Sequence, residues 1–140
     1  MDFDNDPDVI IQARPGVNDL GLIDGDAAAA AGVPPGPIRL LNGWPGAKEW
    51  GYRHVMSNPD RLRAIEGRGY PNAIEFAWAV AQSWTRLHRG PAGPQPRVSV
   101  VSRKDDYELA LALHWTGTRW SVTTMLPFRR VNYPMIYEKM

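Results

Sequence analysis

The chain of 140 residues contains no cysteine. This absence excludes disulfide bonds, zinc sites built on thiolate ligands and catalysis by a cysteine nucleophile. No apolar stretch approaches the roughly 20 residues that a helix needs to cross a bilayer, so we expect no membrane partner. The N-terminus is acidic, whereas a secretory signal peptide begins with positive charge. Any chemistry must therefore come from other side chains, in a chain long enough to bury a core.

Several catalytic signatures are also missing. The sequence has no G-x-S-x-G elbow, no H-E-x-x-H pair and no Walker-type glycine loop. Its carboxylates are too scattered to suggest a glycosidase with paired carboxylates or a two-metal nuclease. We therefore expect no cofactor and no bound metal. A metal-dependent nuclease stays open only as an alternative, which inhibition by EDTA would support.

Charge is distributed unevenly along the chain. Residues 1–36 carry seven acidic side chains and one arginine, a net charge of −6, whereas residues 37–140 carry eight acidic and 15 basic side chains, a net charge of +7. A basic body suits a polyanionic partner. The acidic segment could fold over that body and compete with the partner, but blocks of like charge are usually solvated, so we favour a linker.

The composition of the two parts predicts the same division. Residues 1–36 are rich in Asp, Ala, Gly and Pro, and few of them could seed a core. Within them, 9–12 could pair as a short strand and 27–31 could form a helical turn. We therefore predict an acidic arm or linker over 1–36 and one domain over 37–140.

Helical patterns dominate the first half of this domain. The spacing of Trp50 and His54 predicts a helix over 47–56. Asn58 is a good N-cap and Pro59 a good first helical residue, which predicts a second helix over 59–66. Asn72 caps a third, strongly apolar helix that we expect to reach residue 88.

The second half changes to the alternation typical of strands, over 98–102, 107–115 and 119–126, with a further strand near 131–137. A tight turn at 117–118 would pair Trp115 with Trp120, Leu113 with Val122 and Leu111 with Thr124. The predicted fold class is therefore α+β. An N-terminal helical lobe packs on a C-terminal antiparallel β-meander of about four strands.

The segment GYRHVMSNPDRLR, residues 51–63, is the strongest candidate for chemistry. A histidine titrates near neutral pH and can act first as a general base and then as an acid, which makes His54 a candidate. The guanidinium groups of Arg53, Arg61 and Arg63 could stabilise charge on a phosphate. A surface helix with ordinary basic residues is the alternative. The other two histidines have structural interpretations, at a helix end (His88) and on the solvated face of a strand (His114).

Thr124 is the polar residue on the apolar face of its predicted strand. It could fill the core, as β-branched residues often do in strands, or its hydroxyl could bind a phosphate oxygen in a cleft. Trp50 could stack on a base, although packing is the alternative. Lys104 and Arg129 are further bases that we expect to contact a polyanionic substrate.

Taken in order, these segments resemble the small metal-independent RNase toxins grouped as the barnase–EndoU–colicin–RelE fold. The nearest type is the nuclease domain found at the C-termini of phage proteins and polymorphic toxins. The resemblance covers residues 38–133 and runs through IRLLNG, GYRHV, RAIEGRGY, NAIEF and WSVTTMLP. It implies a helical lobe that carries a histidine and a four-stranded antiparallel sheet that carries a hydroxyl residue.

The resemblance also assigns roles to residues. His54 matches the family's histidine, Arg61 or Arg63 matches a basic residue about two turns later, and Thr124, with Thr123 beside it, matches the threonine of the closing strand. This match favours a cleft position for the Thr124 hydroxyl. The chain departs from the family pattern at two positions: Pro59 replaces a second histidine, and Leu126 replaces an aromatic residue.

The function implied is that of a metal-independent endoribonuclease toxin that cleaves RNA, with tRNA as one candidate, by general acid/base attack of the ribose 2′-OH. An acidic immunity protein is the implied protein partner. The resemblance also implies action in the cytoplasm of a bacterial target cell, after delivery as the C-terminal part of a secreted or phage protein. The alternative is a non-catalytic phage or secretion-system binding module that uses a degenerate nuclease fold.

Overall fold

The computed structural model describes residues 6–104, 107–127 and 133–139. Its four helices are α1 Gly25–Ala31, α2 Tyr52–Met56, α3 Pro59–Gly67 and α4 Ala73–Ser83. Its eight strands are β1 Ile10–Ile11, β2 Gly21–Ile23, β3 Gly36–Leu41, β4 Arg86–Arg89, β5 Arg97–Arg103, β6 Glu108–Trp115, β7 Trp120–Leu126 and β8 Met135–Glu138. The described chain is therefore a mixed α+β fold.

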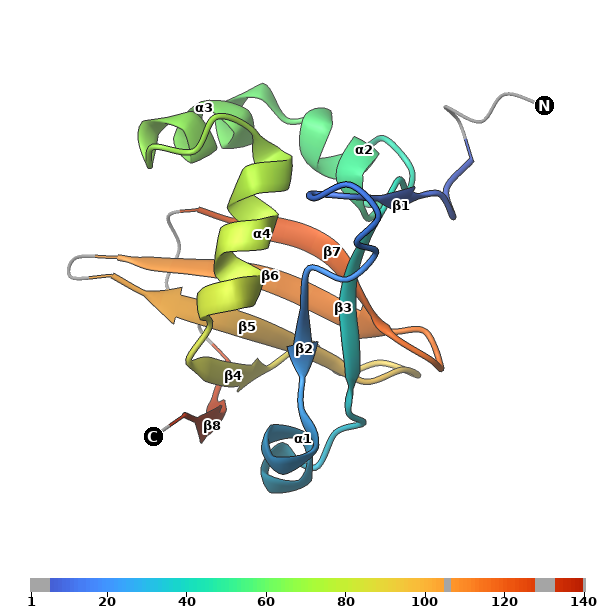
Figure 1. The fold of residues 1–140 in the computed structure, drawn as a ribbon, viewed down its shortest axis with the longest axis vertical. Helices are drawn as coiled ribbons and strands as arrows, with labels where there is room; N and C mark the ends of the chain where they lie inside the picture. The colour runs from blue at the N-terminus through green and yellow to red at the C-terminus, as the bar shows by residue number, and fades with distance from the viewer. Residues whose placement is uncertain (1–5, 105–106, 128–132, 140) are drawn as a thin grey trace.

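The strands form one sheet in the order β1-β3-β7-β6-β5-β4-β8, and β2 also pairs with β3. Strands β5, β6 and β7 lie close to three of the ranges predicted for strands, and each pairs antiparallel with the next. Strand β3 joins this meander in parallel with β7, so the sheet is larger than the predicted one and not wholly antiparallel. Helix α4 crosses one face of the sheet, and α2 and α3 lie at one end of the molecule (Figure 1).

The N-terminal segment differs most from its prediction. Within 6–36, β2 pairs with β3, and Leu20, Ile23 and Ala27 are fully buried in the core. Asp24 caps α1 by accepting a hydrogen bond from the Ala27 backbone N–H at 2.8 Å. The predicted linker is therefore wrong for the described residues 6–36: two short elements contribute a few well-placed apolar residues to the core.

The helices follow their capping signals more closely than their apolar patterns. Helix α3 begins at Pro59, as predicted, because the Asn58 side chain accepts a hydrogen bond from the Arg61 N–H at 3.1 Å. Helix α2 is shorter than predicted and starts only after Gly51, which has a φ of 88°. Helix α4 ends before the extended residue Trp84. The residues expected to complete it form β4, which pairs with β5 and β8.

A β-bulge changes the predicted register between β6 and β7. Trp115 pairs with Trp120 and Leu113 with Val122, as expected, but Ala112 then pairs with Thr124. The predicted pairing of Leu111 with Thr124 is therefore wrong. Leu111 pairs instead with Met125, and both residues are buried in the core.

Thr123 is the additional residue in this bulge, because its neighbours on either side pair with consecutive residues of β6. Side chains alternate along β6, so Ala112 and His114 lie on the face opposite the core residues Leu111 and Leu113. Thr124, as the partner of Ala112, lies on that same non-core face. Bulges re-aim side chains in this way and are common beside active sites.

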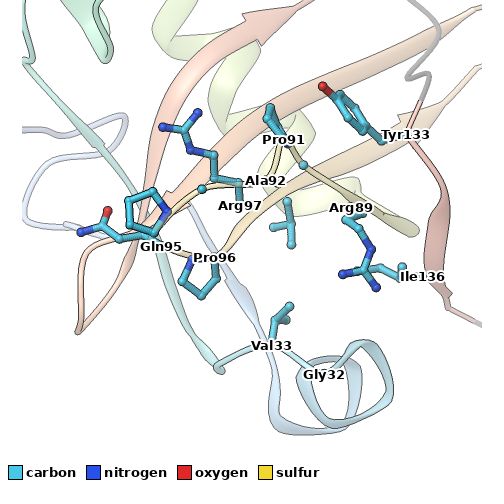
Figure 2. Close-up of a pocket in the computed structure, with 14 residues that line it drawn as sticks. Gly32, Val33, Arg89, Pro91, Ala92, Gln95, Pro96, Arg97, Tyr133 and Ile136 are labelled. Atoms are coloured by element: carbon cyan, nitrogen blue, oxygen red, sulfur yellow. The ribbon is translucent and has the colours of Figure 1, made fainter.

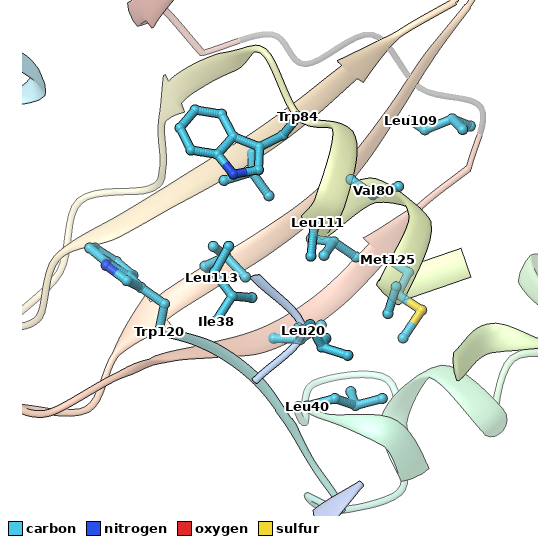
Figure 3. Packing of buried hydrophobic residues seen from close by; sticks show 14 of the residues in the cluster. Leu20, Ile38, Leu40, Val80, Trp84, Leu109, Leu111, Leu113, Trp120 and Met125 are labelled. Carbon is cyan, nitrogen blue, oxygen red and sulfur yellow. The ribbon is translucent and has the colours of Figure 1, made fainter. Parts of the chain in front are cut away.

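The core lies between α4 and the sheet (Figure 3). Trp84 and Trp120 are its largest fully buried side chains, and Leu111 and Leu113 lie near them. Burial of an aliphatic or aromatic side chain stabilises a fold by roughly 1.5–3 kcal/mol. The apolar face of the meander is thus fixed by α4, and the opposite face carries His114 and Thr124.

Candidate active site

His54 is held on α2 with its ring directed at β7. Its side chain is only 9% exposed, and its two ring nitrogens have different partners. Nδ1 lies 2.6 Å from the Gly46 carbonyl oxygen, and Nε2 lies 3.1 Å from Thr124 Oγ1. Because a carbonyl oxygen only accepts, Nδ1 must carry the hydrogen. Nε2 of the neutral ring is therefore a hydrogen-bond acceptor that faces the Thr124 hydroxyl.

Two glycines allow the loop before α2 to pack against β7. A side chain at Gly43, which has a φ of +67°, would place its Cβ 1.9 Å from the Trp50 carbonyl oxygen. Gly51 also has a positive φ, and its N–H donates to the Thr123 carbonyl oxygen at 3.1 Å. Strand β3 pairs with β7 only at Trp120 and Ser121. The start of α2 therefore binds the β7 backbone beyond the end of that pairing.

Arg61 completes the arrangement from α3. Its Nη1 donates a hydrogen bond to Thr124 Oγ1, so the Thr124 hydroxyl contacts both the guanidinium and the imidazole. Since the hydroxyl accepts from Arg61, its own proton is available for Nε2 of His54. The hydrogen bonds then run in one direction, from Arg61 through Thr124 and His54 to the Gly46 carbonyl.

A pocket of about 330 Å³ opens beside these groups. It is lined by Gly46, Ala47, His54, Ser57, Asn58, Pro59 and Arg61. Pro59 lines this pocket and brings no titratable group. Any acid/base chemistry in this pocket therefore centres on one imidazole, with a guanidinium and a hydroxyl beside it.

Other predicted site residues lie elsewhere. Arg63 forms an exposed ion pair with Asp60 and does not line the pocket. Arg53 donates two hydrogen bonds to the Gly43 carbonyl oxygen, at 2.9 and 2.6 Å, and thereby holds the loop. Lys104 is exposed in the turn after β5, and Arg129 lies outside the described residues. Of the candidate cations within the described residues, Arg61 is the one that the structure brings to the Thr124 hydroxyl beside His54.

Thr123 and Trp50 belong to a second polar cluster. Thr123 Oγ1 lies 2.7 Å from Nδ1 of His114, and the rings of Trp50 and His114 meet edge to face with centroids 5.5 Å apart. Burial, and secondarily the nearby Arg97, lower the pKa of His114 below its ordinary value. The sequence interpretation of His114 as merely solvated missed this cluster, because pattern alone did not show that the loop carrying Trp50 packs there.

This cluster lines a pocket of about 300 Å³ together with Lys48, Glu49, Gln95 and Arg97. A larger pocket, of about 580 Å³, lies between the proline-rich loop at 90–96, the end of α1 and β8 (Figure 2). Its lining includes Arg89 and Arg97 but no histidine and no carboxylate. Of these three pockets, two are lined by a histidine, His54 in one and His114 in the other.

No described helix is long and apolar enough to span a membrane. Over the described ranges, no three His, Cys, Asp or Glu side chains are grouped so that they could hold a metal ion. No known family model matches the chain, no curated protein is a detectable relative, and no solved structure matches its fold.

Proposed function

We propose that this chain is a metal-independent endoribonuclease of the toxin type. The observation that carries the proposal is the meeting of His54 and Arg61, from the consecutive helices α2 and α3, at the hydroxyl of Thr124 on the distant strand β7, beside one pocket. An imidazole with one nitrogen fixed and the other directed at a hydroxyl and a guanidinium suits proton transfer at a phosphate ester. RNA supplies its own nucleophile, the ribose 2′-OH.

In the proposed reaction, the substrate 2′-OH replaces the Thr124 hydroxyl as the donor to Nε2 of His54. The ring takes the 2′ proton while the 2′ oxygen forms a bond to phosphorus. The hydrogen bond from Nδ1 to the Gly46 carbonyl keeps the ring in the required tautomer and stabilises the imidazolium that forms.

Arg61 and Thr124 then act on the phosphate. The guanidinium stabilises the negative charge of the pentacoordinate phosphate, and the freed hydroxyl donates to a non-bridging oxygen. The bond from phosphorus to the 5′ oxygen breaks, and that oxygen receives a proton from the imidazolium or from water. The products are a 2′,3′-cyclic phosphate and a free 5′-hydroxyl.

The test is incubation of the purified chain with total RNA, with and without EDTA, beside His54→Ala. We expect cleavage by the wild type in both conditions, cyclic phosphate ends, and near loss of cleavage in the variant. Full activity in His54→Ala would refute the assignment of His54, and loss of wild-type activity in EDTA would favour a metal-dependent enzyme. The proposal includes an acidic immunity protein and action in the cytoplasm of a target cell.

Three observations favour a non-catalytic binding module as a second candidate. Both His54 nitrogens already have partners within the chain, the ring is almost fully buried, and Pro59 replaces the second histidine. A rate profile from acidic to mildly alkaline pH separates the two functions, since cleavage by an imidazole must depend on the protonation state of that ring. RNA binding without cleavage across that range would support the module.

A further inference from the structure

The pockets around His54 and His114 are both lined by the loop before α2. The loop before α2 separates them: Gly46 lines the His54 pocket, whereas Lys48 and Trp50 line the His114 pocket. On β7, Thr124 contacts His54 and the next residue back, Thr123, contacts His114. Because consecutive Cα atoms are about 3.8 Å apart, a ligand that extends past Thr124 reaches the second pocket at once.

The second pocket combines groups suited to both halves of a nucleotide. Lys48 and Arg97 are cations that can contact a phosphate, and Trp50 offers an indole on which a base can stack. Gln95 and Glu49 offer the amide and carboxylate groups that read the edges of unpaired bases in RNA.

Trp50 and His114 are held in place by contacts within the chain. The contact with His114 fixes the Trp50 ring, and His114 is itself anchored on the bulge residue Thr123. Burial and Arg97 lower the pKa of His114, so its ring is neutral at pH 7 and offers a hydrogen bond rather than a charge. The Arg97 side chain extends away from Val33 and Ile136 of the large pocket (Figure 2).

We propose that the His114 pocket binds the nucleotide next to the cleaved bond, with its base on Trp50 and its phosphate on Arg97 and Lys48. This inference rests on the proposed function, because it takes the cleaved phosphate to lie beside His54. It makes the substrate a single-stranded segment of RNA, since a base that is paired in a helix cannot stack on an indole.

The experiment measures binding of a short single-stranded oligonucleotide whose riboses all carry 2′-O-methyl groups, which removes the nucleophile and prevents cleavage. Dissociation constants are measured at several salt concentrations for the wild type, Arg97→Gln and the control Arg103→Gln. Both arginines are exposed at the ends of β5, but Arg103 lines neither pocket. Cleavage kinetics on unmodified RNA are measured for the same three proteins.

We expect Arg97→Gln to raise the dissociation constant about tenfold. The slope of log Kd against log salt concentration should fall by about one, the amount expected for the loss of one phosphate contact. Arg97→Gln should raise KM with little change in kcat, and Arg103→Gln should match the wild type. Cleavage by the wild type with equal binding by Arg97→Gln would overturn the subsite and leave the proposed function standing. The other informative result is weaker binding by Arg97→Gln together with no RNA cleavage by the wild type. It would support the His114 pocket as a nucleotide site and overturn only the proposed catalytic function.

Discussion

Two histidines lie at the same face of the sheet, one on either side of a short loop, and their surroundings differ. His54 donates from Nδ1 to a carbonyl and directs Nε2 at a hydroxyl that also accepts from a guanidinium. His114 bonds a threonine through Nδ1 and packs against an indole. The difference teaches that two histidines can share one face of a sheet and yet differ in their partners, which is why we propose proton transfer for His54 and ligand binding for His114.

Replacing the two histidines separately tests this comparison most strongly. We expect His54→Ala to lower kcat by about 10²–10⁴, because it removes the group that moves the proton. We expect His114→Ala to act mainly on KM. Steady-state cleavage of an RNA oligonucleotide measures both effects, and thermal unfolding checks that each variant is folded. Equal losses of kcat in the two variants would break the distinction.

Arg61 and Arg63 lie two residues apart on α3. Replacing each of them should give the next largest difference in kcat. Arg61→Gln should lower kcat by about 10²–10³, the range found when one donor to a transition-state oxyanion is removed. Arg63→Gln should change kcat by less than about twofold, since an exposed ion pair with Asp60 contributes little. A larger loss in Arg63→Gln would reassign the phosphate contact to that residue.

The Thr124 hydroxyl is expected to contribute less than either charged group. Thr124→Val keeps the shape of the side chain but removes the hydroxyl, and we expect kcat to fall about tenfold, as for the loss of one hydrogen bond in the transition state. Thr124→Ser should recover most of the activity. If Thr124→Val and Thr124→Ser were equally impaired, packing rather than the hydroxyl would explain the loss.

The smallest expected effect is on the pH dependence of the free energy of unfolding. Burial lowers the pKa of His114 in the folded chain, so the unfolded chain binds more protons at mildly acidic pH. The contribution of His114 to stability is therefore present above about pH 6.5 and decreases as the pH falls towards the lowered pKa. Urea unfolding measures the free energy of unfolding at about pH 7.5 and pH 5.5. The decrease in this free energy between the two pH values should be smaller for His114→Asn than for the wild type. An unchanged loss would contradict the lowered pKa.

The sequence predicts those elements whose signals are local. Asn58 and Pro59 mark the start of α3 by capping alone, and strict alternation locates β6 and β7. The prediction that His54, Arg61 and Thr124 act at one site came from a resemblance. No local rule places a helical residue beside a strand residue 70 positions away.

Features that depend on distant partners were beyond prediction from pattern. The bulge at Thr123 leaves no mark in the alternation, so the register after Val122 was wrong and Thr124 was placed on the core face. Leu20 and Ile23 are isolated apolar residues in an acidic segment, and only pairing of β2 with β3 makes them core. The end of α4 depends likewise on the pairing of β4 with its neighbours.

The parallel pairing of β3 with β7 has a consequence for how the chain folds. Ile38 meets Trp120 only after a long intervening segment has been ordered, and closure of such a loop costs entropy before its contacts form. High contact order of this kind slows folding. We therefore expect the hairpins of the meander to form early and His54, Arg61 and Thr124 to meet last. If the proposed function holds, a partly folded chain would not yet cleave RNA.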